Sequence, residues 1–335
     1  MSAKPTTYAS YKAYYEKLIK HLMTYNEKHK AFREQNKNIP FRFDIPKNTI
    51  TTLSGQVREL FKKESNLLRL TAPFFIFGDI HGQFSDLVRF LEMTGIPTGK
   101  NTQNVKRFIF NGDIVDRGDC SIECLTMLFC LKFCFPNDVF ILRGNHECSH
   151  INKLYGFQTE CNERYQSDGN QIWKELNTTL HLLPICCTIN NDIFCTHGGI
   201  PKDTLSSLDD INKINRNMNI PDSGLLCDLT WSDPKTHKEK WMDNDRGISH
   251  TFNQTALNQF MRKHNLSLVC RAHQMVSEGF KFFGGNKLVT VFSAPNYCGE
   301  FDNAAAILCV DKDLICRFEI IKVLRKSLQS YITIS

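Results

Sequence analysis

The sequence has no apolar run long enough to cross a membrane. A helical span needs about 18 consecutive apolar residues, and even the apolar stretch from Leu125 to Phe135 is interrupted by Lys132. The first ten residues, MSAKPTTYAS, have no apolar core of the kind found in export signals. The final YITIS matches no prenylation or retention signal. We therefore expect a soluble protein of the cytoplasm or the nucleus, with no membrane span.

Positively charged residues outnumber negatively charged ones only slightly. The 335 residues include 41 Lys and Arg against 35 Asp and Glu, which gives a formal net charge of +6. This excess is weaker than the clustered basic footprint of a nucleic-acid-binding domain, so we expect no nucleic-acid partner. The 14 cysteines are dilute in a chain of this length and do not indicate a secreted disulfide scaffold. A hydrophobic content of 41% is typical of an ordinary folded chain.

The chain also lacks internal repeats and Gly/Ser-rich linkers, which favours one main domain. From Tyr11 to about Asn36, apolar residues recur at helical spacing among lysines and predict a basic amphipathic helix. We expect its apolar stripe to pack on the domain, although a membrane or an acidic partner is an alternative. A second helix is expected from near Thr51 to about Glu64. The predicted division is a helical extension and connector over 1–49, one catalytic domain over 50–323, and a short tail over 324–335.

After Pro73, short β-rich apolar runs alternate with longer helical patterns, which predicts an α/β fold with a buried sheet. The expected strands are Phe74 to Phe77, Phe108 to Phe110, Val139 to Leu142, Ile193 to Cys195, Leu268 to Cys270, Leu288 to Phe292, Ala305 to Val310 and Ile315 to Ile321. The last two follow one another without a helix between them. Part of the sheet should therefore be antiparallel.

Polar strings follow the first five of these strands. They are GDIHG at 78–82, GDIVDRG at 112–118, RGNHE at 143–147, THGG at 196–199 and RAHQ at 271–274. Ligands of an open α/β sheet bind beyond the carboxyl ends of its strands, so these strings should meet at one site. A single Gly-Asp pair is usually only a turn, but several such strings at strand ends make coincidence a poor explanation.

The side chains in these strings form a metal-binding set. Its members are Asp79, His81, Asp113, Asn145, His197 and His273. Mixed oxygen and nitrogen donors suit Mn, Fe or Zn better than calcium. We expect two ions, with Asp79 and His81 at the first, the last three residues at the second, and Asp113 bridging both. Two ions about 3.5 to 4 Å apart stabilise the attacking and leaving oxygens of an in-line phosphoryl displacement.

Further residues complete the chemistry of phosphoryl transfer. His146 follows the ligand Asn145 and is placed to protonate a leaving oxygen, while Asp116 can hold its imidazole in the required tautomer. Arg117 can grip phosphate oxygens in a bidentate manner, as can Arg246 in the loop from Asn244 to Gly247.

At these residues the sequence resembles the metallophosphoesterase superfamily and, within it, the phosphoprotein phosphatases. The family strings GDxHG, GDxVDRG and GNHE stand at Gly78, Gly112 and Gly144, and the likeness runs from about residue 50 to about 323. GEFDNA at 299–304 resembles the type 1 serine/threonine phosphatase catalytic subunit more than the type 2A or calcineurin branches. The resemblance implies a calcineurin-like fold, with a central β-sandwich of mixed sheets flanked by α-helices.

The resemblance also implies functional residues and two divalent metal ions, either Mn or an Fe/Zn pair. It gives the same six metal ligands, His146 as proton donor with Asp116, and Arg117 and Arg246 as phosphate-binding residues. Tyr297 is expected to line the cleft, and this expectation rests on the resemblance alone, as does the specific choice of Arg246.

Type 1 enzymes bind regulatory subunits through Val-x-Phe motifs in an apolar groove. The matching positions here are Ile193, Leu268, Phe282, Leu314, Cys316 and Phe318. The acidic rim of that groove is replaced by Asn190, Ser267 and Lys312, so we expect docking that depends less on flanking arginines.

The predicted function is hydrolysis of phosphoserine and phosphothreonine on proteins, by a metal-bound hydroxide with His146 as general acid. Two alternatives remain. One is a metallophosphoesterase for nucleotides or other small phosphates, and the other is a catalytically weak scaffold that only binds regulators.

Overall fold

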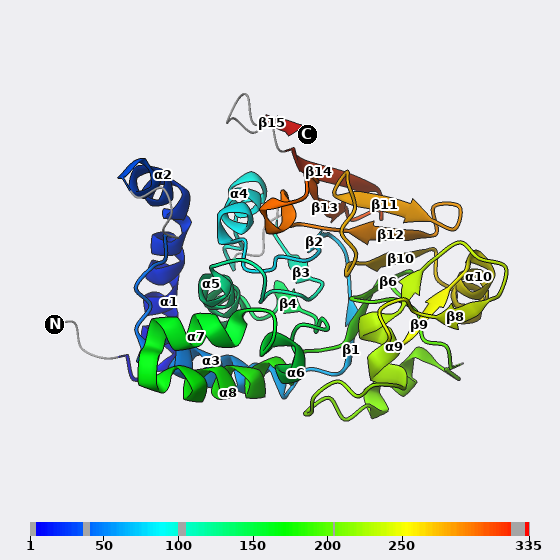
Figure 1. Cartoon of the computed structure of the whole chain (residues 1–335), viewed down its shortest axis with the longest axis horizontal. Helices are drawn as coiled ribbons and strands as arrows, with labels where there is room; N and C mark the ends of the chain where they lie inside the picture. The colour runs from blue at the N-terminus through cyan, green and yellow to red at the C-terminus, as the bar shows by residue number, and fades with distance from the viewer. Residues whose placement is uncertain (1–4, 36–40, 100–104, 204, 323–331, 335) are drawn as a thin grey trace.

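Two large sheets form the centre of the molecule in a computed structural model that describes residues 5–35, 41–99, 105–203, 205–322 and 332–334 (Figure 1). The first six-stranded sheet has the order β1 (Leu67–Leu70), β5 (Cys186–Ile189), β6 (Ile193–Thr196), β10 (Leu268–Arg271), β12 (Leu288–Val291) and β11 (Phe280–Phe283). The second has the order β15 (Ile332–Ile334), β14 (Cys316–Lys322), β13 (Ala305–Val310), β2 (Phe74–Phe77), β3 (Phe108–Phe110) and β4 (Val139–Ile141). A small third sheet contains β7 (Asp233–Pro234), β9 (His250–Phe252) and β8 (Trp241–Asp243).

The two large sheets pack face to face, and alternation along their strands explains why. In β2, Phe74 and Ile76 join the apolar core between the sheets, whereas Phe77 joins the core under the helices. In β6, Ile193 and Cys195 face the space between the sheets, and Phe194 faces outward. Successive side chains of a strand point to opposite faces, so a strand that is apolar throughout contributes side chains to two cores. The architecture is the expected β-sandwich.

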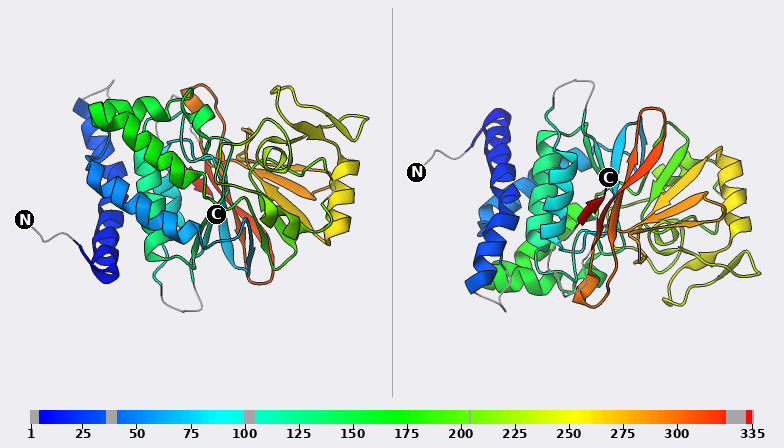
Figure 2. Two further views of the ribbon diagram at one scale, coloured as in Figure 1. Left: turned by 90° about the horizontal axis from the view of Figure 1, so that it is seen from below. Right: turned by 90° about the horizontal axis from the view of Figure 1, so that it is seen from above.

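Helices cover the outer faces of both sheets (Figure 2). Those on the side of the second sheet are α1 (Tyr8–Met23), α2 (Tyr25–Gln35), α3 (Lys47–Phe61), α4 (Phe84–Thr94), α5 (Ser121–Cys134), α7 (Phe157–Tyr165) and α8 (Gly169–Leu180). The first sheet is covered by α9 (Leu225–Trp231) and α10 (Gln254–His264), and the short α6 (Ser149–Asn152) follows β4. Helix α5 is buried along its whole length, and its Lys132 is paired with Glu64. An apolar helix of this kind has to lie inside a layer of other helices.

The predicted strands are confirmed to within about one residue at each end, and β2, β3 and β13 match their predicted bounds. The prediction of one helix from Tyr11 to Asn36 is wrong, because the helix is interrupted at Thr24 and divides into α1 and α2. The backbone N–H of Thr24 still donates to the carbonyl of His21. Helix α3 begins at Lys47, four residues before the predicted start, because the Pro46 carbonyl accepts the first hydrogen bonds of the helix. Residues 36–40 of the predicted connector lie outside the described residues.

The first and last described elements, α1 and β15, pack against the central structure. Tyr15 and Ile19 of α1 are buried in the same core as α5, as expected for a helix that packs on the domain. In the predicted tail, β15 pairs with β14 in antiparallel register. The division at residues 49 and 323 stays a prediction. None of the helices in the described ranges is long and apolar enough to span a membrane.

Candidate metal centre

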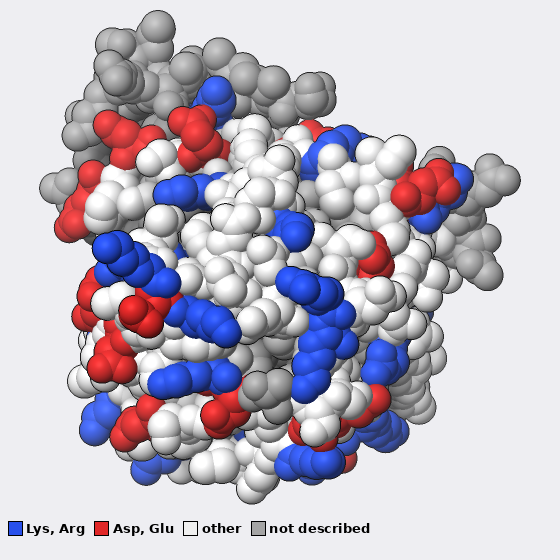
Figure 3. Space-filling model, turned by 90° about the vertical axis from the view of Figure 1, so that its right-hand side faces the viewer, with Lys and Arg blue, Asp and Glu red and all other residues white. Residues whose placement is uncertain are grey.

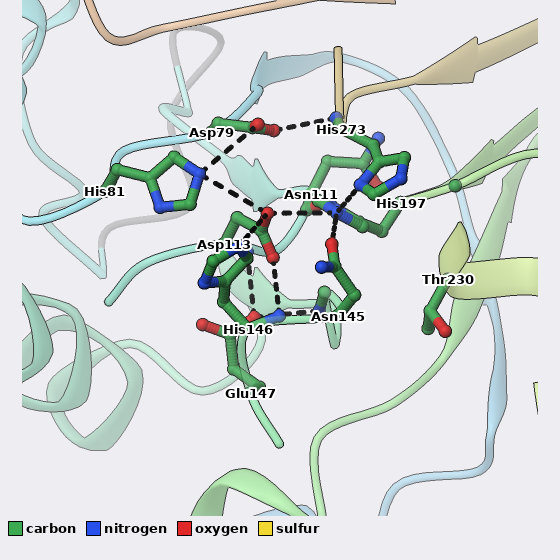
Figure 4. A network of polar contacts seen from close by, with 12 residues as sticks. Asp79, His81, Asn111, Asp113, Asn145, His146, Glu147, His197, Thr230 and His273 are labelled. Carbon is green, nitrogen blue, oxygen red and sulfur yellow. Dashed lines mark hydrogen bonds and ion pairs between the residues drawn. The ribbon is translucent and has the colours of Figure 1, made fainter. Parts of the chain in front are cut away.

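The predicted site residues lie at one edge of the sandwich, where strands of both sheets end (Figure 4). In the second sheet, β2, β3 and β4 are parallel and lead to Asp79, Asp113 and Asn145. In the first sheet, β6 and β10 are parallel and lead to His197 and His273. Parallel strands place their carboxyl ends side by side, and the packing of the two sheets brings both sets together.

The loops after these strands have an unusual backbone. His81, Asp113, Asp116 and His273 all have positive φ angles, of 45°, 53°, 75° and 68°. Non-glycine residues seldom adopt this left-handed region, and when they do they cluster at functional sites. At Gly144 a Cβ atom would stand 2.2 Å from Asp113 Oδ1 and 2.4 Å from its backbone nitrogen. Only glycine allows the two loops to approach this closely.

Asp113 stands at the centre of the site, as the bridging role requires. Its Oδ2 lies 3.5 Å from His81 Nε2 and 3.2 Å from His197 Nε2. His81 Nε2 is also 3.7 Å from Asp79 Oδ2. The carboxylate of Asp113 therefore faces both predicted ion positions.

The second ion position is defined by acceptor atoms that point at one another. His197 Nε2 lies 2.8 Å from Asn145 Oδ1 and 3.2 Å from His273 Nδ1. His197 Nδ1 is 2.8 Å from the Asn111 carbonyl and must donate to it, which leaves a lone pair on Nε2 of the neutral ring. With His197 neutral, its Nε2 lone pair, the amide oxygen of Asn145 and the carboxylate of Asp113 point toward one another, and a bound cation would stabilise this arrangement. These residues fit a metal ion.

The electrostatics of the buried groups agree with this fit. Burial, together with the negative charge of Asp113, raises the pKa of Asp79 to about 7. Burial lowers the pKa of His81 to about 3, so this ring is neutral, which is the form that binds metal. Burial would also lower the pKa of His197, but the negative charge of Asp113 outweighs it and raises the pKa to about 8. A bound cation would relieve the repulsion between the two carboxylates and replace the proton on His197.

His146 lies beside the cluster, next to the first ion position. Its Nδ1 is 2.6 Å from Asp116 Oδ2, and Asp116 Oδ1 accepts the backbone N–H of Phe157 at 2.9 Å. These contacts fix the ring with Nε2 toward the centre, 4.0 Å from Asp113 Oδ2. The predicted pairing of His146 with Asp116 is present.

The two predicted arginines lie beside different residues of the site. The Arg117 guanidinium lies 4.1 Å from the centre of the Tyr155 ring, which itself is 5.4 Å from the ring of His146. Arg246 donates from Nε to Asp233 at 2.8 Å and from Nη2 to the carbonyl of His273 at 3.2 Å.

Tyr297 borders the first ion position. Its ring centre is 5.3 Å from that of His81, and its backbone N–H bonds to Asn303. The structure thus brings every predicted site residue to the same edge of the sandwich.

Sequence reasoning missed several supporting residues. The Glu147 carboxylate accepts the backbone N–H groups of Asp113, Ile114 and Gly144 at 2.8 to 2.9 Å, and so holds two metal-site loops together. Its place in the RGNHE string was a signal that could have identified it. Tyr155, which supports Arg117, stands in no motif, and no sequence signal could have identified it.

The predicted docking groove lies away from this edge, along β11 and β14. Phe280 stacks on Phe318 with ring centres 3.9 Å apart, and Phe282 is 41% exposed beside them. The expectation that docking depends less on flanking arginines stays a prediction, but some negative charge lies near the groove. Ser267 donates a hydrogen bond to the Asp192 carboxylate at 2.6 Å, and Asp311 also lies near Cys316, so negative charge remains at the rim.

Comparisons with known proteins agree with this geometry. Residues 72–277 match the family model of the calcineurin-like phosphoesterases. A protein serine/threonine phosphatase from Saccharomyces cerevisiae, described as similar to human phosphatase PP5, is 32% identical, with a TM-score of 0.74 over 82% of this chain and 90% of its own. A cold-active protein-tyrosine phosphatase from a psychrophilic Shewanella species shares the fold at 18% identity, with a TM-score of 0.57 over 83% of this chain and 84% of its own.

The chain therefore belongs to the calcineurin-like phosphoesterases and, among them, to the phosphoprotein phosphatase family. It is a phosphoesterase, a hydrolase whose buried clusters of His and Asp can hold metal ions. Its likeness to the type 1 branch stays a prediction.

Proposed function

We propose that this protein removes phosphate from phosphoserine and phosphothreonine residues of other proteins, with two divalent metal ions as cofactors. The observation that carries the proposal is the convergence of metal-binding atoms around Asp113, with the His146–Asp116 pair at their side. The 32% identity to a serine/threonine phosphatase supports the choice of substrate. Residues 50–323 would form the catalytic domain.

The chain supplies ligands for both ions. Asp79 and His81 would hold the first, and Asn145, His197 and His273 the second, with Asp113 shared. Mn, or an Fe/Zn pair, suits these oxygen and nitrogen donors. When bound, the ions supply Lewis-acid polarisation of the phosphate and a water of lowered pKa.

His146 would complete the reaction by giving its Nε2 proton to the serine or threonine oxygen as a water oxygen bonds to phosphorus and the P–O bond of the ester breaks. The electron pair of that bond leaves with the oxygen, and the proton converts it to a hydroxyl group. Asp116 holds Nδ1 at 2.6 Å, which keeps the other nitrogen toward the substrate. Arg117 and Arg246 would bind the phosphate oxygens, and Tyr297 would border the cleft.

Regulatory subunits would determine much of the specificity. We propose that Val-x-Phe segments dock in the apolar groove, where the stacked rings of Phe280 and Phe318 form part of the floor. Asp192 at the rim favours a basic residue beside such a segment. We place the protein in the cytoplasm or the nucleus.

The test is turnover of matched substrates by the purified chain, with its metal content measured in parallel. We expect hydrolysis of phosphoserine and phosphothreonine peptides to exceed that of a phosphotyrosine peptide and of diadenosine tetraphosphate. Preference for the dinucleotide would favour the small-molecule alternative. No turnover of any substrate by the metal-loaded chain would favour the regulator-binding scaffold.

Replacement of His146 by Ala should lower kcat by about 10²- to 10⁴-fold, because a positioned general acid contributes this much. Metal content should be unchanged, since the proposed ligands remain. Asp113→Asn, in contrast, should lose metal as well as activity. Hydrolysis that is unchanged in either variant would refute the mechanism.

A further inference from the structure

A large basic cleft lies beside the metal centre, and Arg246 is its one lining residue to which the proposed chemistry gives a role. Its volume is about 1020 Å³, and its lining includes Lys235, Lys238, Arg246 and Lys281 but no Asp or Glu. A pocket of this size is large enough for several residues of a peptide. Figure 3 shows this side of the molecule, where Lys and Arg side chains cross the centre of the face and acidic ones lie mostly toward its margins.

The cleft is joined to the metal centre through a polar network. Asp233 accepts hydrogen bonds from Arg271 Nη2 and Arg246 Nε, each at 2.8 Å. Arg246 also bonds to the carbonyl of His273, while Gln274, the next residue, lines the cleft. The cleft and the metal site are therefore adjacent, and Arg246 and Gln274 connect them.

The register of the first sheet relates Lys281 to Arg271, which lies two residues before the metal-site residue His273. Lys281 is paired with Thr290 in β12, and Thr290 is paired with Arg271 in β10. Residues paired across strands point to the same face of a sheet, so Lys281 lies on the face that carries Arg271. Two strand spacings separate them by about 10 Å. An extended peptide covers that distance in about three residues.

The opposite wall is held by the start of α10. The Asn253 side chain caps this helix by accepting the N–H groups of Thr255 and Ala256, and it donates to the carbonyls of His237 and Lys238. The positive end of the helix dipole thus faces the same cleft. Lys235 is paired with Asp245, but within the described ranges no ion pair to Lys238 or Lys281 is formed.

We propose that the cleft binds acidic or phosphorylated residues that flank the target phosphoserine or phosphothreonine. The proposal rests on the proposed function and names the substrates that the site prefers. An anion in the cleft, about three to five residues from the phosphate that is hydrolysed, would place the peptide across both sites. Lys238 and Lys281 are the residues that determine this preference.

The test compares phosphoserine peptides that differ only in their flanks. Three Glu residues are placed three to five positions before or after the phosphoserine, and three Gln residues replace them in the matched peptide. One of the two acidic peptides should show kcat/KM about five- to tenfold above its Gln counterpart, and high salt should remove the difference. Lys238→Gln combined with Lys281→Gln should lower this ratio to near one. Both lysines are exposed, so the core is not disturbed.

A matched control is Lys174→Gln on α8, an exposed lysine outside the cleft, which should leave the ratio unchanged. An independent readout is the anisotropy of a fluorescent, unphosphorylated Glu peptide, which should bind the full-length protein less tightly in the double variant.

Equal acidic-to-neutral ratios in the wild type and the double variant would overturn the inference, as would tighter binding of a single-stranded oligonucleotide than of the peptide. Failure of the proposed function would be distinct, because the phosphoserine peptide with Gln flanks would then also resist hydrolysis.

Discussion

The metal-site edge and the helical layer over the second sheet are both buried, but they are built in different ways. The edge buries charged and polar side chains on loops with left-handed residues, such as Asp113 and His273. The layer around α5 buries apolar side chains on regular helices. At the edge, backbone contacts position each functional atom, so a small change should abolish the chemistry. In the layer, apolar contacts are numerous and similar, so a change should lower stability and leave the chemistry intact.

The sharpest test of this difference is Gly144→Ala. The added Cβ would stand 2.2 Å from Asp113 Oδ1 and 2.8 Å from Glu147 Oε2, so the loops must move apart. Displacement of about 1 Å in a reacting group can reduce the rate 10²-fold, and here a shared metal ligand also moves. We expect activity to fall by more than about 100-fold, with loss of bound metal measured by mass spectrometry.

The matched control for Gly144→Ala is Gly55→Ala in α3, where no atom lies within 4 Å of the added Cβ. This change should raise stability by about 0.5 to 1 kcal/mol, because alanine loses less backbone entropy in a helix. Equal activity of the two variants would contradict the view that the chemistry at the metal-site edge depends on the backbone geometry of its loops.

In the helical layer, Leu128→Ala should lower the free energy of unfolding by about 2 to 5 kcal/mol. Leu128 lies in α5 and is fully buried, so the substitution leaves a cavity. Urea unfolding measures the change, with Met242→Ala, at a side chain that is 48% exposed, as the control. The rate per folded molecule should remain near that of the wild type. A large loss of kcat in folded Leu128→Ala would show that the two regions are coupled.

The two regions also differ in how well the sequence predicts them. The site residues were predictable because short strings follow strands, and parallel strands end at one edge. The sequence did not reveal β1 and β5, since Leu67–Leu70 and Cys186–Ile189 are short apolar runs that do not differ from helix segments or loops by pattern alone. Tyr155 could not be predicted either, because its position under Arg117 depends on tertiary packing. The break between α1 and α2 at Thr24 could not be predicted either, because no proline or glycine marks it in the sequence.

The smallest effect, and the finest test of the edge, concerns the pH dependence of Asp116→Asn. Burial lowers the pKa of His146, but the negative charge of Asp113 and the hydrogen bond and charge of Asp116 outweigh it, so the pKa is raised above its ordinary value. Asparagine removes the charge of residue 116 and weakens the bond, so the pKa of His146 should fall.

A general acid acts only while it is protonated, and its activity is therefore lost as the pH rises through its pKa. The descending limb of kcat against pH should accordingly move to lower pH in Asp116→Asn. Comparison of the two proteins with the same metal ions bound isolates the contribution of Asp116, and Asp119→Asn, on the same loop but outside the His146 contact, serves as control. An unmoved limb would mean that His146 is not the acid, or that its proton is held by the metal-site charges alone.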